Sequence, residues 1–120
     1  MTAKSTEELV ADAKTRIKEV GVHEVKRMRD REEHFTLIDV REPMEWNLGR
    51  IPGAVHIPLG MLESKIENAA SRDARVVLYC ARGNRSALAA DTLQNMGYAN
   101  VSSMAGGWLA WAQDVGEVED

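Results

Sequence analysis

The sequence predicts an α/β domain with a mainly parallel central sheet and helices on both of its faces. Short apolar runs alternate with segments whose apolar residues recur at helical spacing, an order typical of parallel strands joined by helical crossovers. The chain has 120 residues, of which 44% are hydrophobic and 28% are charged, so it can bury one core. No internal repeat or linker divides it, which favours a single domain.

The first element is a predicted helix near the N-terminus. Ser5 and Glu8 have the spacing of a capping box, in which each side chain bonds the backbone of the other residue. The apolar residues that follow share one helical face: Leu9, Val10, Ala13 and Ile17. Gly21 is expected to end this helix. Over residues 22–33 the pattern is weaker, and we expect a short strand followed by a helix.

The remaining elements alternate between strand and helix. Four apolar runs predict strands: Phe35 to Val40, Ala54 to Ile57, Arg75 to Cys80 and Val101 to Met104. Helical spacing predicts three helices: one carrying Leu62, Ile66, Ala69 and Ala70, one over 86–96 that stops at Gly97, and one carrying Trp108, Trp111, Ala112 and Val115. Gly106 and Gly107 are expected to form the turn before the last helix.

This order divides the chain into three parts. Residues 1–19 are predicted to be an N-terminal helical extension that packs on the domain or makes an oligomer contact. Residues 20–115 are the predicted domain, and residues 116–120 an acidic C-terminal tail that we expect to fray. A monomer and a homodimer both fit the sequence.

Composition excludes several classes of protein. Fifteen Lys and Arg against nineteen Asp and Glu give a net charge of -4, which argues against a nucleic-acid or anionic-membrane surface. The apolar runs are far shorter than the roughly 18 residues that span a bilayer, and acidic residues stand where a signal peptide would be apolar. We therefore expect a cytoplasmic protein. Its single cysteine and three scattered histidines predict no disulfide, metal site or cofactor.

The chemically most informative segment follows the third of these strands. Cys80 ends that strand, and ligands of open α/β sheets bind beyond the carboxyl ends of strands. A short loop then leads into a helix, so backbone N–H groups and the helix dipole are expected to converge on the sulfur and favour a thiolate. Such a thiolate is a nucleophile. The alternative is that Cys80 is a small buried hydrophobic residue.

The loop residues have complementary expected roles in binding an anionic substrate. Arg82 and Arg85 add positive charge, and Gly83 permits a positive φ that turns its N–H inward. Asn84 and Ser86 are expected to shape the loop and cap the next helix. The candidate site is therefore Cys80 with the loop Ala81, Arg82, Gly83, Asn84, Arg85 and Ser86.

Three motifs in order resemble the rhodanese, or thiosulfate sulfurtransferase, family. They are L-I-D-V-R-E-P-M-E-W-N-L-G-R-I-P-G-A-V-H-I-P-L from Leu37 to Leu59, L-Y-C-A-R-G-N-R-S-A around Cys80, and M-A-G-G-W-L-A-W from Met104. The resemblance implies a rhodanese-like fold and a Cys80 that carries sulfane sulfur as a persulfide. It implies transfer from thiosulfate or a similar donor to cyanide, a thiol or an acceptor protein. Arg50 departs from the family, which usually has His there; we interpret the change as neutral.

Two other functions stay open. A cysteine phosphatase or arsenate reductase also places Cys and Arg around a backbone anion site, but those enzymes resemble Cys plus five residues plus Arg, whereas four residues separate Cys80 from Arg85. A non-enzymatic module that carries sulfur or binds a partner is the other alternative. Asp39 and Arg41 are interpreted as members of a structural ion-pair network with Glu42 or Glu45, and His56 as a polar-face residue.

Overall fold

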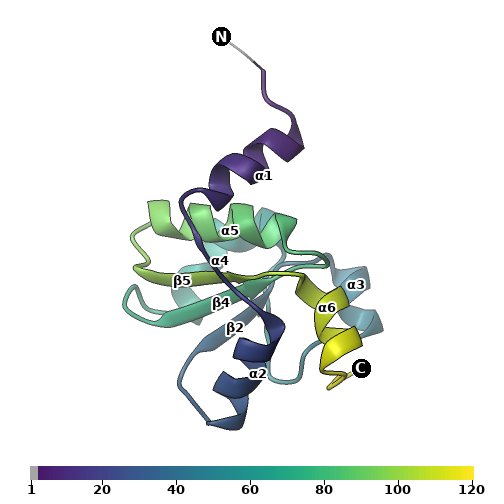
Figure 1. The fold of residues 1–120 in the computed structure, drawn as a ribbon. Coiled ribbons are helices and arrows are strands. Elements are labelled where there is room, and N and C mark those ends of the chain that lie inside the picture. The colour runs from purple at the N-terminus through teal and green to yellow at the C-terminus, as the bar shows by residue number, and fades with distance from the viewer. Residues whose placement is uncertain (1–2) are drawn as a thin grey trace.

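The computed structural model describes residues 3–120 and contains one five-stranded sheet (Figure 1). The strands, in chain order, are β1 (Lys18–Val20), β2 (Thr36–Asp39), β3 (Val55–His56), β4 (Arg75–Tyr79) and β5 (Asn100–Met104). They pair in the order β1-β5-β4-β2-β3, and every pairing is parallel. The helices are α1 (Thr6–Lys14), α2 (Val22–Asp30), α3 (Pro43–Leu48), α4 (Leu62–Ala69), α5 (Asn84–Asn95) and α6 (Gly107–Asp114), with a 3-10 turn at Leu59–Met61. The predicted fold class is confirmed.

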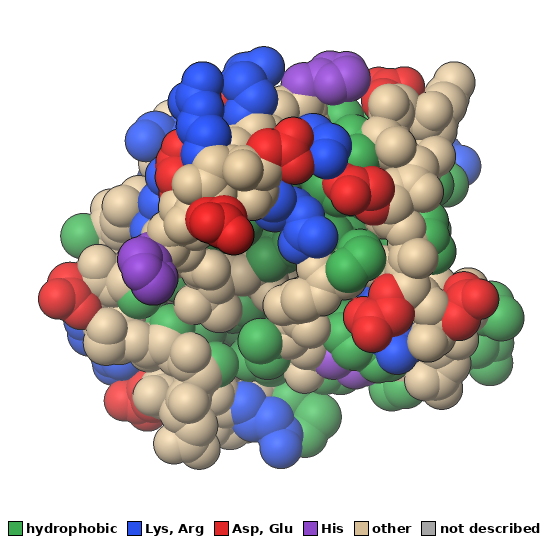
Figure 2. Space-filling view, turned by 90° about the horizontal axis from the view of Figure 1, so that it is seen from below, with side chains coloured by type: hydrophobic (Ala, Val, Ile, Leu, Met, Phe, Trp, Pro, Cys, Tyr) green, Lys and Arg blue, Asp and Glu red, His purple; other side chains and the backbone are tan. Residues whose placement is uncertain are grey.

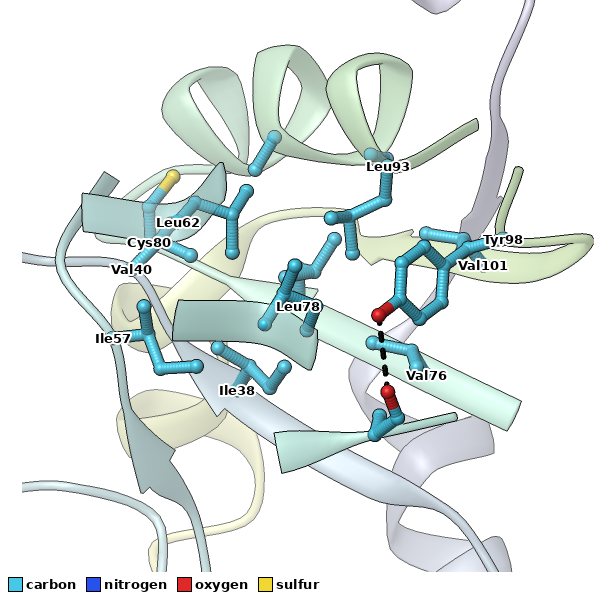
Figure 3. Close-up of a cluster of buried hydrophobic side chains, with 14 residues drawn as sticks. Ile38, Val40, Ile57, Leu62, Val76, Leu78, Cys80, Leu93, Tyr98 and Val101 are labelled. Carbon is cyan, nitrogen blue, oxygen red and sulfur yellow. Dashed lines mark hydrogen bonds between the residues drawn. The ribbon is translucent and has the colours of Figure 1, made fainter. Parts of the chain in front are cut away.

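Helices cover both faces of the sheet, so the molecule has two apolar cores. Helices α1, α4 and α5 lie on one side and α2 and α6 on the other (Figure 1). On β4, Val76 and Leu78 belong to the core under α4 and α5 (Figure 3), whereas Val77 and Tyr79 belong to the opposite core. Burial on both sides explains why this strand reads as an uninterrupted apolar run. On the α2 and α6 side, basic and acidic side chains are interspersed at the surface (Figure 2).

The N-terminal helix forms with the predicted cap but ends early. The Glu8 N–H donates to Ser5 Oγ and the Ser5 N–H donates to Glu8 Oε1, both at 3.1 Å. The expectation that this helix runs to Gly21 is wrong, because the chain leaves the helix after Lys14 and Lys18–Val20 pairs with β5. Backbone bonds to β5 replace those of a longer helix, and Gly21 caps α2 instead. The domain boundary after residue 19 stays a prediction.

The segment just after helix α1 is joined to α5 by a bidentate ion pair. Arg16 donates to the two carboxylate oxygens of Asp91 at 3.0 and 2.8 Å. The predicted extension therefore packs on the helix that begins at the Cys80 loop.

Two further elements differ from expectation. Helix α3 was not predicted; it has Pro43 at its start and a Glu42–Glu45 capping box, but no buried residue, so it lacks an apolar repeat.

The C-terminal tail does not fray: Arg50 and Glu119 exchange backbone bonds of 2.9 and 2.8 Å in an antiparallel bridge. Trp111 Nε1 also donates to the Glu117 carbonyl at 2.7 Å. The acidic end is thus fastened to the domain.

Candidate active site

Cys80 follows β4 at the carboxyl edge of the sheet. Its side chain lies on the face covered by α4 and α5 and points toward α5 (Figure 3). Only 1% of the residue is exposed. The sulfur therefore lies at the border between the apolar core and the loop that leads into α5.

Two backbone N–H groups of the loop converge on the sulfur. Sγ accepts from the Gly83 N–H at 3.1 Å and from the Ser86 N–H at 3.3 Å, and the Cys80 thiol itself donates to Ser86 Oγ at 3.5 Å. Gly83 has φ +95°, a conformation that side-chain-bearing residues rarely adopt, and this turns its N–H toward the sulfur. Such convergent donors stabilise negative charge on an atom at their focus.

The N-terminus of α6 holds the outer side of the same loop. The Trp108 N–H donates to the Cys80 carbonyl at 2.7 Å and the Leu109 N–H to the Ala81 carbonyl at 3.0 Å. Gly107 makes this approach possible, because a Cβ there would lie 2.7 Å from the Ala81 carbonyl carbon and oxygen. The sequence indicated only a turn at this glycine; its contact with the loop comes from the tertiary fold.

The two loop arginines have different surroundings. Arg85 forms a bidentate pair with Glu45 of α3, at 2.8 and 3.0 Å, whereas Arg82 is exposed and has no salt bridge within residues 3–120. The bond from Arg85 lowers the pKa of Glu45 from 4.5 to about 2. The stabilisation from this pair is therefore present above pH 4.5 and is lost as the pH falls through about 2. Glu45 was not predicted as part of the site.

The expected side-chain cap at the start of α5 is absent. Asn84 is the first helical residue, Gly83 is the N-cap, and no side-chain bond caps the helix. The Ser86 hydroxyl instead accepts from Cys80 Sγ and forms a hydrogen bond with Ser103 of β5, with 2.7 Å between the two hydroxyl oxygens. The prediction that Asn84 and Ser86 cap the helix is wrong, because the left-handed Gly83 already places the backbone.

Asp39 and Arg41 form a buried ion pair with each other rather than with Glu42 or Glu45. Arg41 Nη2 lies 2.7 Å from Asp39 Oδ2, and the two side chains are 3% and 0% exposed. Arg41 also donates to the Gly49 carbonyl at 2.7 Å and lies over the Trp108 ring. The expected partners were wrong because α3 directs Glu45 to Arg85.

His56 and Arg50 share one aromatic neighbour. The His56 ring stacks on Trp46 at a centroid distance of 4.7 Å, and its Nε2 lies 2.8 Å from the Arg41 carbonyl oxygen. Arg50 covers the same Trp46 ring and donates to the Asp120 carbonyl at 3.1 Å. The contacts of both residues support structural roles.

In the part of the chain that the structure describes, no helix is both long and apolar enough to cross a membrane. Residues 3–120 also contain no group of three His, Cys, Asp or Glu side chains placed to hold a metal ion.

The fold and the loop define a class of protein: an α/β domain that holds a cysteine sulfur among backbone N–H donors at the carboxyl edge of a parallel sheet. The chain belongs to the rhodanese-like domain family, whose model matches residues 21–114. The predicted resemblance is confirmed.

Relatives support sulfur chemistry at the level of the family. A sulfurtransferase of Allochromatium vinosum is 35% identical over 88 residues, which cover 73% of this chain and 80% of that protein. YrkF of Bacillus subtilis, whose name gives a proposed role as a sulfur carrier, is 34% identical over 95 residues. The match covers 79% of this chain but only 51% of YrkF, so the chain spans about half the length of that relative.

A solved structure matches almost the whole chain. A Rhodopseudomonas palustris protein of unknown function, named as a possible tyrosine phosphatase, superposes with a TM-score of 0.88 at 30% identity. The match covers 99% of this chain and 97% of that one.

Proposed function

We propose that the protein is a sulfurtransferase in which Cys80 carries sulfane sulfur as a persulfide. The observation that carries the proposal is the convergence of the Gly83 and Ser86 N–H groups on Cys80 Sγ. Fixed donors of this kind favour an anionic sulfur without reorganisation during the reaction. They suit both a thiolate before transfer and a charged persulfide after it.

The proposed reaction is a double displacement. The Cys80 thiolate attacks the outer sulfur of thiosulfate, a sulfur–sulfur bond to Cys80 forms, and the original sulfur–sulfur bond breaks. Its electron pair leaves with sulfite, so three negative charges stand on each side of the step. The terminal sulfur of the persulfide then bonds to cyanide, a thiol or an acceptor protein, and the thiolate returns.

The direct test is the mass of the purified protein before and after exposure to thiosulfate. We expect a gain of one sulfur atom, which cyanide or a thiol removes. Repeated release of thiocyanate would identify an enzyme, and a single stoichiometric release would favour a sulfur carrier. No gain of sulfur from any sulfane donor would contradict the proposal.

The phosphatase alternative is favoured by the name of the Rhodopseudomonas palustris structure. Two features of this chain argue against it. Only four residues separate Cys80 from Arg85, and the Arg85 guanidinium is already engaged by Glu45. We therefore expect negligible release of phosphate from aryl phosphates. Robust phosphate release that depends on Cys80 would contradict this prediction.

The two arginines are expected to give different kinetic defects. Arg82→Ala removes an exposed positive charge and should raise KM for thiosulfate about two- to fivefold, with a weaker dependence on salt. Arg85→Ala removes the ion pair with Glu45 of α3. It should lower kcat about 10- to 100-fold, because the loop N–H groups are then no longer held in position around the sulfur. Glu45→Gln is the matched variant and should also lower kcat.

Steady-state kinetics at two ionic strengths would check this division of roles. Identical defects in the Arg82→Ala and Arg85→Ala variants would show that it is wrong.

A further inference from the structure

Two buried hydroxyl groups lie in a row behind the Cys80 sulfur. Ser86 in α5 and Ser103 in β5 are both 0% exposed. Their oxygens are 2.7 Å apart, and Ser86 Oγ is 3.5 Å from Cys80 Sγ. Ser103 comes from a strand distant in sequence from the loop, and neither the motifs nor the proposed mechanism uses it.

The number of hydrogens decides in which direction this row donates. A neutral Cys80 donates its thiol hydrogen to Ser86 Oγ, and the single hydrogen of Ser86 can then go to Ser103. Within residues 3–120 the Ser103 side chain has no hydrogen-bond partner except Ser86, so the Ser103 hydrogen is then left without an acceptor. An ionised Cys80 has no hydrogen to donate. Ser103 can then donate to Ser86 and Ser86 to Sγ, so both buried hydroxyl hydrogens have acceptors.

Burial makes this difference important. A buried hydroxyl without a partner is costly, and hydrogen bonds in a row polarise one another. The arrangement directed at the sulfur avoids the unpaired hydroxyl and places the hydrogen of Ser86 where negative charge resides.

We propose that Ser103 is a positioning residue that directs the Ser86 hydroxyl to the Cys80 sulfur and thereby stabilises the thiolate. The inference rests on the proposed function, in which this thiolate is the attacking group. Ser103 acts through Ser86 and does not touch the substrate. Its removal should therefore decrease the thiolate fraction, while a fully ionised Cys80 should keep its reactivity.

Strand β5 offers a matched control one residue away. Ser103 pairs in register with Leu78, which belongs to the core under α4 and α5. Ser102 pairs with Val77, which belongs to the opposite core, so Ser102 faces away from Cys80. Ser102 is also buried, with 7% exposed. Ser102→Ala thus removes the same atom from the same strand on the other face.

The experiment measures alkylation of Cys80 by iodoacetamide from pH 5 to 10, followed by mass. Cys80 is the only cysteine in the chain, so the signal has one source. We expect Ser103→Ala to react about three- to tenfold more slowly than the parent near neutral pH, and equally fast at high pH, where both sulfurs are ionised. Ser102→Ala should follow the parent curve. The charged groups beside the loop, Arg82, Arg85 and Glu45, are unchanged in every variant.

A second pair of variants separates the hydroxyl from packing. Ser103→Thr keeps the hydroxyl and Ser103→Val removes it at nearly equal volume, so only Ser103→Val should show the slow reaction near neutral pH. The proposal is overturned if Ser103→Ala coincides with the parent, if Ser102→Ala shifts equally, or if Ser103→Thr and Ser103→Val agree. Alkylation needs no sulfur donor, so its outcome is independent of whether the protein transfers sulfur.

Discussion

Replacing Cys80 with serine is expected to abolish sulfur transfer and the mass gain from thiosulfate. The chain has no other thiol, and a serine hydroxyl does not form a persulfide. Loss of a covalent nucleophile lowers turnover by at least about three orders of magnitude in enzymes of this type of mechanism. Thiocyanate release with thiosulfate and cyanide, measured for parent and variant side by side, checks the prediction.

The fold should survive this substitution. Cys80→Ser changes one atom at the end of a strand, and Gly83 and Ser86 can still donate to it. The control is therefore the midpoint of urea unfolding, which should stay near that of the parent. Retained thiosulfate-dependent transfer in a folded Cys80→Ser protein would rule out the persulfide mechanism.

Replacing Arg41 with methionine is expected to cause the largest loss of stability. Asp39 is 0% exposed, and Arg41 supplies its salt bridge at 2.7 Å. Without the guanidinium, the carboxylate is left buried and unpaired, which costs about 3–5 kcal/mol of unfolding free energy. The Gly49 carbonyl also loses its 2.7 Å donor. Urea unfolding followed by circular dichroism measures the loss.

The matched control is Arg27→Met, which removes an exposed arginine from its pair with Glu24 on the surface of α2. Such exposed pairs contribute at most about 1 kcal/mol. Equal destabilisation by the two substitutions would contradict the assigned role of the buried pair.

The parts of the fold that could be predicted are those with a local signal. Strand β4 is apolar on both faces, and the loop after Cys80 is contiguous in sequence, so both could be placed without tertiary information. Glu45 could not be linked to Arg85, because α3 is short and exposed and gives no apolar repeat. Its Pro43 start and Glu42–Glu45 capping box were the available signals.

Other features depend on contacts between distant segments. Ser103 looks like an ordinary strand residue until β5 lies beside β4 and α5 covers it. Lys18–Val20 continues a charged helical pattern. It becomes a strand only because it forms backbone hydrogen bonds with β5. The acidic tail has no local pattern either, and the backbone of Arg50 holds it in place.

The contact between α6 and the outer side of the Cys80 loop restricts rotation of two peptide planes. A peptide unit between Cys80 and Gly83 could in principle flip and turn a carbonyl oxygen toward the sulfur, where it would repel an anion. The Trp108 and Leu109 amides hold the carbonyls of Cys80 and Ala81 on the far side. These two carbonyl oxygens are thus held toward α6, while the N–H groups of Gly83 and Ser86 point to the sulfur from the other side of the loop.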